Sequence, residues 1–155
     1  MLQISLAPVS EQDIQDLLLD LLPEDGQEIL AMGLAPEWGV RNSVETSIEC
    51  VAIRESGRLV ALFGVSRTAA LADPRPWLLG TSLLRRHPVT FLVLSRKIIR
   101  RWRSMFPYMT NYVDARHCRA TKWLEWLGAK LTLQPEFGPF RRPFYLFEFG
   151  EPPCA

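Results

Sequence analysis

The stretch Met109–Ala129, MTNYVDARHCRATKWLEWLGA, decides the fold of this 155-residue chain. Its first part, Met109–Val113, contains Thr, Tyr and Val, residues that favour a strand. Its second part, Cys118–Leu127, has apolar residues at helical spacing and is followed by Gly128, a residue typical of a helix C-terminus. The stretch therefore predicts a strand that is followed almost at once by a helix.

A longer helix is predicted upstream of this stretch and ends before Pro107. Its apolar face consists of Phe91, Leu94, Ile98, Trp102 and Met105, and most of its remaining surface carries Arg96, Lys97, Arg100, Arg101 and Arg103. Such a division of apolar and charged residues is typical of an amphipathic helix. A short apolar strand, Trp77–Thr81, precedes it and is joined to it by a loop, Ser82–Pro88.

The N-terminal third predicts one strand and two helices. Apolar residues alternate at Leu2, Ile4 and Leu6, so residues 3–9 are predicted to form a strand. Ser10 is a suitable N-cap for an amphipathic helix, which Pro23 ends, and a second helix reaches Gly33. Residues 34–42 contain Pro and Gly and are predicted to form a loop, and residues 43–49 one or two further helical turns.

A hairpin follows, with strands at 50–54 and 59–65 and Gly57 in the turn. Two more strands, 131–133 and 144–149, close the chain around a loop rich in Pro and Gly. Strands and helices alternate along most of the sequence, which predicts an α/β fold with a mixed sheet and helices on both faces. No repeat or low-complexity linker divides the chain, so residues 1–155 are interpreted as a single domain.

This order of elements resembles that of the acetyl-CoA-dependent N-acetyltransferases of the GNAT superfamily. The local sequence is similar too: strand 111–115, helix 117–127 and the closing Gly128-Ala129 match the family's strand, helix and glycine signature, and Arg119-Ala120 match its Arg-Ala pair. His117 stands where the family has asparagine. The resemblance implies a V-splayed central sheet in which strand 77–81 runs parallel to strand 109–113 and diverges from it.

Three segments also resemble a small GNAT-like protein of short-tailed coliphages, described as an internal virion protein or morphogenesis factor. They are Gly33–Pro36, Ser47–Val51, and Thr110–Val113 through Gly128-Ala129. This resemblance implies a role in virion assembly or structure, with other virion or assembly proteins as partners. It also implies that the chain is located in the host cytoplasm during assembly, with the virion as an alternative location.

GNAT enzymes hold the pyrophosphate of acetyl-CoA with backbone amides before their third helix, in a loop of pattern Gln/Arg-x-x-Gly-x-Gly/Ala. The residues at this position are Arg85, Arg86, His87, Pro88, Val89 and Thr90. Arg85 fits, but Pro88 supplies no amide and Thr90 adds a branched side chain where the phosphate should come close. The acetyl-CoA site is therefore interpreted as degenerate, although the basic residues could still attract phosphate. Alternatively, Pro88 is simply the first residue of a helix.

Catalysis in the superfamily often uses a tyrosine as general acid four residues before the closing glycine, and that position is Leu124, which cannot donate a proton. A general base needs a pKa near neutrality, and the candidates are Glu49, Asp114 and His117. Each also has a structural interpretation: the two carboxylates as solvated edge or cap residues, and His117 as a polar residue at a helix start.

Two surfaces are candidates for contact with partners. The segment 137–145 is rich in aromatic residues for a connecting loop, and together with the helix behind it predicts a protein-docking surface made by Trp126, Phe137, Phe140, Arg141 and Arg142. The basic helix face at 96–103 could make a weak contact with DNA phosphates, or could simply be solvated.

Composition and motifs narrow the classes of function that remain possible. The formal net charge is +1, so any electrostatic role must come from a local patch. Cys50, Cys118 and Cys154 are far apart and have neither metal-ligand nor disulfide-framework spacing. No signal peptide or membrane segment is predicted, and no metal motif is found.

The sequence thus predicts a GNAT-fold phage protein that acts in virion assembly or as a virion component, without a cofactor. The alternative is an active N-acetyltransferase that uses acetyl-CoA on an amine substrate. A DNA-associated factor is a third hypothesis.

Overall fold

Ser10 begins the first helix, α1 (Glu11–Leu19), with a capping box. Its hydroxyl oxygen accepts a hydrogen bond from the Asp13 amide, and the Asp13 carboxylate accepts one from the Ser10 amide at 2.9 Å. The structure is a computed structural model that describes residues 2–5 and 7–154. The first strand, β1 (Leu2–Ser5), is shorter than predicted, and Leu6 lies outside the described residues.

The predicted loop at 34–42 is wrong, because helix α3 (Pro36–Glu45) occupies it. Pro36 lies in the first helical turn, where the missing N–H is not needed. Gly39 is buried against helix α2 (Pro23–Ala31), and a Cβ added there would lie 2.7 Å from Cγ2 of Ile29. Both residues that suggested a loop therefore serve the helix: one starts it and the other allows it to pack closely.

The first sheet is antiparallel throughout, in the order β1-β2-β3-β4. The predicted hairpin is confirmed and is longer than expected: β2 covers Ser47–Glu55 and β3 covers Arg58–Ser66. Gly57 has a φ of 77° in the turn between them, a conformation that glycine adopts without strain. The edge strand β4 (Arg75–Gly80) pairs with β3.

The second sheet contains β5 (Met109–Asp114), β6 (Lys130–Phe137) and β7 (Arg142–Phe149), in the order β5-β7-β6. The aromatic segment 137–145 was predicted to be a loop, but most of it belongs to the β6–β7 hairpin. Phe144 is fully buried because it lies on β7 and packs against Phe137.

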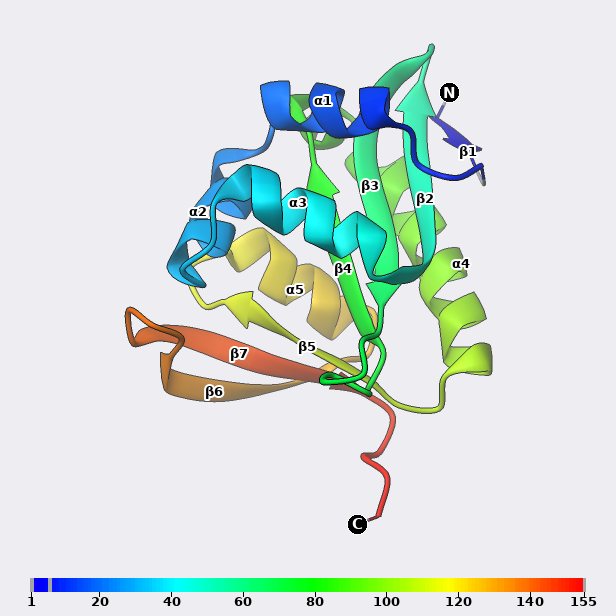
Figure 1. Ribbon diagram of the computed structural model, residues 1–155. Coiled ribbons are helices and arrows are strands. Elements are labelled where there is room, and N and C mark those ends of the chain that lie inside the picture. The colour runs from blue at the N-terminus through cyan, green and yellow to red at the C-terminus, as the bar shows by residue number, and fades with distance from the viewer. Residues whose placement is uncertain (1, 6, 155) are drawn as a thin grey trace.

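The backbones of the two sheets approach each other where β4 and β5 begin. The Thr110 amide donates to Pro74 O at 3.0 Å, and Nδ2 of Asn111 donates to Pro76 O at 3.1 Å. Beyond these contacts the strands diverge, as Figure 1 shows. The expected splay is therefore present, but the expectation that strands 77–81 and 109–113 belong to one central sheet is wrong, because β4 and β5 lie in different sheets.

Helices cover both faces of the first sheet (Figure 1). Helices α1, α2 and α3 pack on the face that carries Ala52 and Leu62. The opposite face carries Val51 and Phe63 and packs against helix α4 (Pro88–Met105), while helix α5 (Cys118–Trp126) packs on the second sheet through Leu124.

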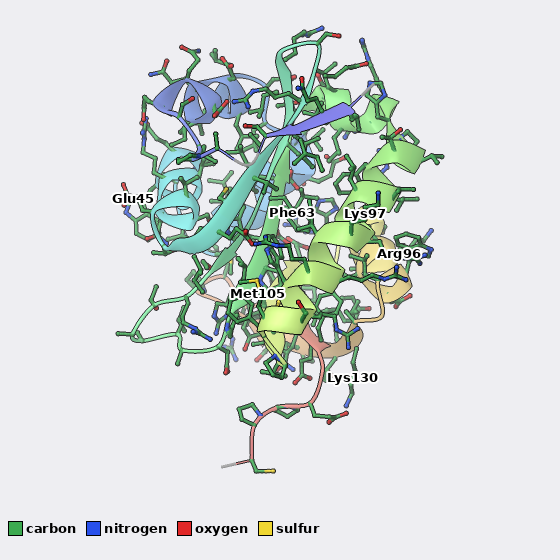
Figure 2. All side chains as sticks on the ribbon, turned by 90° about the vertical axis from the view of Figure 1, so that its right-hand side faces the viewer. Glu45, Phe63, Arg96, Lys97, Met105 and Lys130 are labelled. Carbon is green, nitrogen blue, oxygen red and sulfur yellow. The ribbon has the colours of Figure 1, made fainter. Side chains whose placement is uncertain are left out.

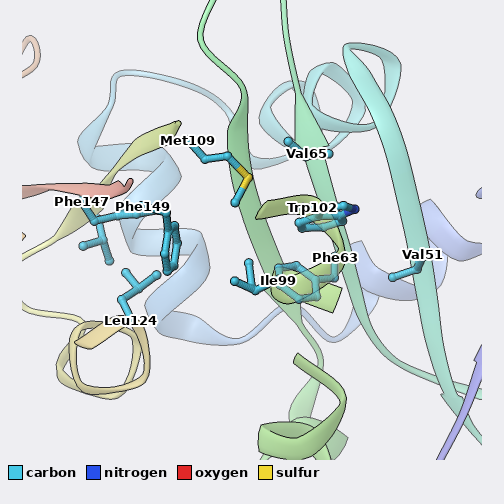
Figure 3. Close-up of a cluster of buried hydrophobic side chains, with 10 residues drawn as sticks. Val51, Phe63, Val65, Ile99, Trp102, Met109, Leu124, Phe147 and Phe149 are labelled. Carbon is cyan, nitrogen blue, oxygen red and sulfur yellow. The ribbon is translucent and has the colours of Figure 1, made fainter. Parts of the chain in front are cut away.

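The largest cluster of buried side chains joins the two sheets to α4 and α5 (Figure 3). Trp102 is fully buried, and its ring lies edge-on to Phe63 with centroids 4.8 Å apart. The buried face of α4 consists of Phe91, Ser95, Ile99 and Trp102. Met105 was expected on this face but is 46% exposed. Within the described residues, no helix has the length and apolar character needed to span a membrane.

Candidate functional site

Helix α2 closes the opening between the diverging ends of β4 and β5. The carboxylate of Asp25 accepts a hydrogen bond from the Gly80 amide at 2.8 Å, and the carboxylate of Glu28 accepts one from the Asp114 amide at 2.6 Å. The residue before the helix, Leu22, donates its amide to Gly80 O at 2.9 Å. Backbone groups at the ends of both strands are therefore bonded to α2 and its first flanking residue.

His117 connects this arrangement to helix α5. Its Nδ1 accepts a hydrogen bond from the Ala120 amide at 3.4 Å, which caps the helix, and its Nε2 lies 2.9 Å from the second carboxylate oxygen of Asp25. Burial acts to lower the pKa of His117, but the hydrogen bond to Asp25 and the negative charges of Asp25 and Glu28 outweigh it and raise the pKa. The result is a buried His–Asp pair between α2 and α5.

The neighbouring carboxyl groups differ in their affinity for protons. Burial raises the pKa of Glu28 to about 7, and the charges of Asp25 and Asp114 act in the same direction. Burial also acts to raise the pKa of Asp114, but the hydrogen bonds from Arg116 lower it below its usual value. One carboxyl group with a pKa near neutrality thus lies beside two others, Asp25 and Asp114, which pair with His117 and Arg116.

A small hollow of about 20 Å³ lies at this cluster and is lined by Glu24, Gln27, Asp114, Arg116 and His117. This volume has room for about one water molecule. The pantetheine arm of a coenzyme would need a much larger channel.

The structure brings together two of the three catalytic candidates. Asp114 and His117 both line the hollow, whereas Glu49 lies on β2, where it binds Arg101 and accepts a hydrogen bond from Nε1 of Trp102 at 2.6 Å. The interpretation of Asp114 as a solvated residue is wrong, because it is only 2% exposed. Its position at the end of β5, under α2, explains that burial.

Solved structures of acetyltransferases are similar to the chain over almost its whole length. The ribosomal-protein-S18-alanine N-acetyltransferase of Escherichia coli is 14% identical, with 96% of this chain and 92% of that chain covered and a TM-score of 0.67. A Bacillus subtilis acetyltransferase in complex with CoA is 12% identical, with 97% and 99% covered and a TM-score of 0.67. A GNAT-family protein from Desulfovibrio desulfuricans is 10% identical, with 97% and 99% covered and a TM-score of 0.65.

The chain has the GNAT fold. No model of a known protein family matches its sequence, and no curated protein matches it either. At these identities the similarity establishes the GNAT fold, and the chemistry has to be argued from the residues of this chain.

In the GNAT loop that would hold the pyrophosphate, the side chains already have partners within the protein. Arg85 forms an ion pair with Glu24 of α2, and Nε2 of His87 lies 2.7 Å from a carboxylate oxygen of Glu55. Pro88 is the first residue of α4, so the amides that a phosphate could still reach at this helix start are those of Val89, which is 72% exposed, and Thr90. Arg86 is exposed beside them.

These residues do not fit acetyl-CoA. The loop offers one amide fewer than the GNAT pattern, the backbone at the end of β4 is bonded to Asp25 and Leu22, and the hollow at this end of the opening is about the size of one water molecule. Leu124, in the position of the usual acid, is 4% exposed and packs in the main core.

The residues of the predicted docking surface lie in two places. Phe137 stacks on Tyr112 with ring centroids 4.1 Å apart. Phe140 is 61% exposed at the tip of the β6–β7 hairpin, where Arg141 pairs with Glu136 at 2.7 Å and Arg142 is exposed. Trp126 is 43% exposed on α5, and the guanidinium of Arg96 lies 3.8 Å from its ring centroid.

Sequence reasoning missed Asp25 and Glu28, the two residues that close the opening. Both lie in a short acidic segment of α2, which is the composition of an ordinary solvated helix. Their partners Gly80 and Asp114 follow 55 and 86 residues later, and no local pattern indicates such contacts. The signal that could have found Asp25 is its spacing: it lies four residues before the apolar Ile29, and so on the same helix face.

Proposed function

We propose that this chain uses the GNAT fold as a binding scaffold in the assembly or structure of a phage particle, and that it does so without acetyl-CoA. One observation carries the proposal that acetyl-CoA is not used: the carboxylates of Asp25 and Glu28 hold α2 across the opening between β4 and β5. Pro88 in the phosphate loop and Leu124 in the acid position support it. The phage role is supported by the sequence resemblance of the segments at 33–36, 47–51 and 110–113.

Two groups of variants separate the two obstacles to acetyl-CoA. Replacing Pro88 by Gly and Thr90 by Ala restores the loop pattern, whereas Asp25→Ala removes the side chain that ties α2 to β4. If α2 is the main obstacle, the loop variant alone binds acetyl-CoA no better than the unaltered chain, and binding gains require Asp25→Ala as well. Calorimetric titration with acetyl-CoA of the unaltered chain, the loop variant and the loop variant that also carries Asp25→Ala makes this comparison. Thermal melts check that each protein folds.

The particle role is tested by affinity-tagging the chain in phage-infected cells. We expect the tagged chain to co-purify with capsid, portal or tail proteins, or with particle precursors. Recovery of the chain alone, throughout the infection, would contradict the assembly role.

An acetyltransferase is the second candidate, because the buried pair of His117 and Asp25 lies beside Asp114 in a fold whose Bacillus subtilis neighbour was solved in complex with CoA. A base with a tuned pKa is what removal of a proton from an amine requires. The test is release of free CoA thiol from acetyl-CoA in the presence of amines. Release that disappears in His117→Gln, with an unchanged melt, would favour the enzyme over the scaffold.

A further inference from the structure

The charges of this chain are divided between two opposite faces. Residues 88–130 carry nine Lys and Arg against two Asp and Glu, a net charge of +7, and the remainder carries nine against fifteen, a net charge of −6. Residues 1–46, which include α1, α2 and α3, contain nine acidic residues and one basic residue. The formal net charge of the whole chain is therefore close to zero although one face is strongly basic and another is strongly acidic.

The basic face draws its residues from α4, α5 and the start of β6. Arg96 covers Trp126, Nε1 of Trp123 donates to Ser95 Oγ at 3.0 Å, and these contacts hold α5 beside α4. Figure 2 views the molecule from this side, with Arg96, Lys97 and Lys130 labelled. We define the basic face as Arg96, Lys97, Arg100, Arg103, Arg119, Lys122 and Lys130; all are exposed except Arg96, which is half-buried.

The cations of the basic face have no carboxylate partners among the described residues. Helix α4 contains no acidic residue, and its Arg101 is left out of the basic face because it pairs with Glu49 of β2. Within the described residues the seven positive charges therefore form no ion pair, and binding of an external anion would reduce their mutual repulsion.

The acidic face does not provide that anion in a second copy of the chain. Seven of its nine carboxylates already bind an arginine, His117, Ser82 or a backbone amide of their own chain, for example Glu11 with Arg41 and Glu24 with Arg85. A head-to-tail contact between copies would have to break these pairs.

The geometry points to a nucleic-acid duplex as the partner: we infer that the basic face binds the phosphate backbone of double-stranded DNA independently of its base sequence. Arg96, Arg100 and Arg103 span about 10 Å along α4, because a helix rises about 1.5 Å per residue. Duplex DNA presents one phosphate for about every 1.7 Å of axis, so several cations can engage phosphates together. Protein interfaces, in contrast, exclude charge from their centre.

The test measures binding of a fluorescein-labelled 20-base-pair duplex of arbitrary sequence by anisotropy between 50 and 200 mM salt. Contact with at least four phosphates predicts that log K falls with log salt at a slope of about −3.6 or steeper. The variant Lys97→Gln with Arg100→Gln should flatten that slope by about two. Its matched control, Arg58→Gln with Arg67→Gln, removes the same charge from exposed positions outside the basic face and should leave the slope unchanged.

Three outcomes would overturn the inference. The first is the absence of duplex binding at 50 mM salt. The second is an equal loss in both variants, which would show a response to net charge alone. The third is equal affinity for polyglutamate of the same charge, which would identify an acidic protein as the partner. Thermal melts verify that both variants fold, and none of these results depends on whether acetyl-CoA binds.

Discussion

The carboxylate of Asp25 accepts a hydrogen bond from the amide of Gly80 at 2.8 Å, although 55 residues separate the two in sequence. Asp25 is only 5% exposed, and its second oxygen binds Nε2 of His117 at 2.9 Å. One side chain therefore joins α2 to the end of β4 and to the start of α5. This side chain therefore holds α2 across the opening between the ends of β4 and β5.

Asp25→Ala should lower the free energy of unfolding by about 1–3 kcal/mol, because it leaves the Gly80 amide buried without an acceptor and His117 without its partner. Urea denaturation measures the change. Asp16→Ala, which removes a carboxylate on α1 that binds only Gln12 of the same helix, should change stability by less than about 0.5 kcal/mol. Equal effects of the two variants would show that α2 is not held by Asp25.

Glu28→Gln should make the protein more stable at pH 8 and leave it nearly unchanged at pH 4.5. The pKa of Glu28 is raised to about 7 from an ordinary value of 4.5, so the native state holds a proton that the unfolded state releases between these pH values. The free energy of unfolding therefore falls as pH rises through this range. The gain at pH 8 is up to about 3 kcal/mol, since glutamine keeps the acceptor for the Asp114 amide and carries no charge.

Urea denaturation of Glu28→Gln and of wild type at the two pH values checks this. Glu45→Gln, an exposed position at the end of α3, serves as the control and should show no such pH dependence. The raised pKa of His117 also makes wild type lose stability as pH rises above 6.5. Because the charge of Glu28 helps to raise that pKa, the comparison with Glu28→Gln measures the joint contribution of Glu28 and His117. A variant that is less stable than wild type at pH 8 would mean that Glu28 is ionised without penalty.

Two matched glycine substitutions test the packing of α3 on α2. Gly39→Ala should destabilise the protein, because the new methyl group would lie 2.7 Å from Cγ2 of Ile29, which is itself buried. Gly26→Ala, at the same helix depth in α2, has its nearest neighbour at 3.7 Å and should stabilise by about 0.5–1 kcal/mol. Thermal melts of the two variants should therefore shift in opposite directions.

Phe140→Ala with Arg141→Ala should leave the thermal melt nearly intact, because Phe140 is 61% exposed and Arg141 pairs only with exposed Glu136. The proposal of docking through this hairpin predicts that the same variant is lost from particles or from co-purified complexes. Phe144→Ala is the contrasting variant: its side chain is fully buried, and its removal should destabilise the protein by about 3–5 kcal/mol. Normal incorporation of the folded double variant would place the partner surface elsewhere.

The elements with local signals could be predicted from the sequence. Ser10 forms the expected N-cap, Gly57 lies in the expected hairpin turn, and Gly128 follows the end of α5 with a φ of 97°. Helix α3 could not be predicted from the sequence, because proline and glycine usually interrupt a helix. Pro36 is compatible with α3 because it lies in the first turn, and Gly39 because it packs on Ile29. The buried face of α4 also differs from the predicted one because of tertiary packing. Ser95 is buried and accepts a hydrogen bond from Trp123, whereas the larger Met105, predicted to be buried, is exposed.

The candidate site was predictable only in part. His117 and Asp114 were identified by residue type, as groups that can act as a general base, and no motif placed them. Their burial, and the pKa of Glu28, depend on α2, which reaches them from almost ninety residues away. Glu49 was an equally good candidate by residue type, but tertiary packing places it against Trp102 on another side of the molecule.

Calorimetric titration of the unaltered protein with acetyl-CoA tests the central claim most directly, because the claim is that α2 and Pro88 leave the GNAT fold without a cofactor site. The account predicts no measurable heat of binding up to about millimolar acetyl-CoA, which corresponds to a binding free energy weaker than about −4 kcal/mol. A Kd in the micromolar range or below, about −8 kcal/mol, would contradict it and would make the acetyltransferase the better account of this chain.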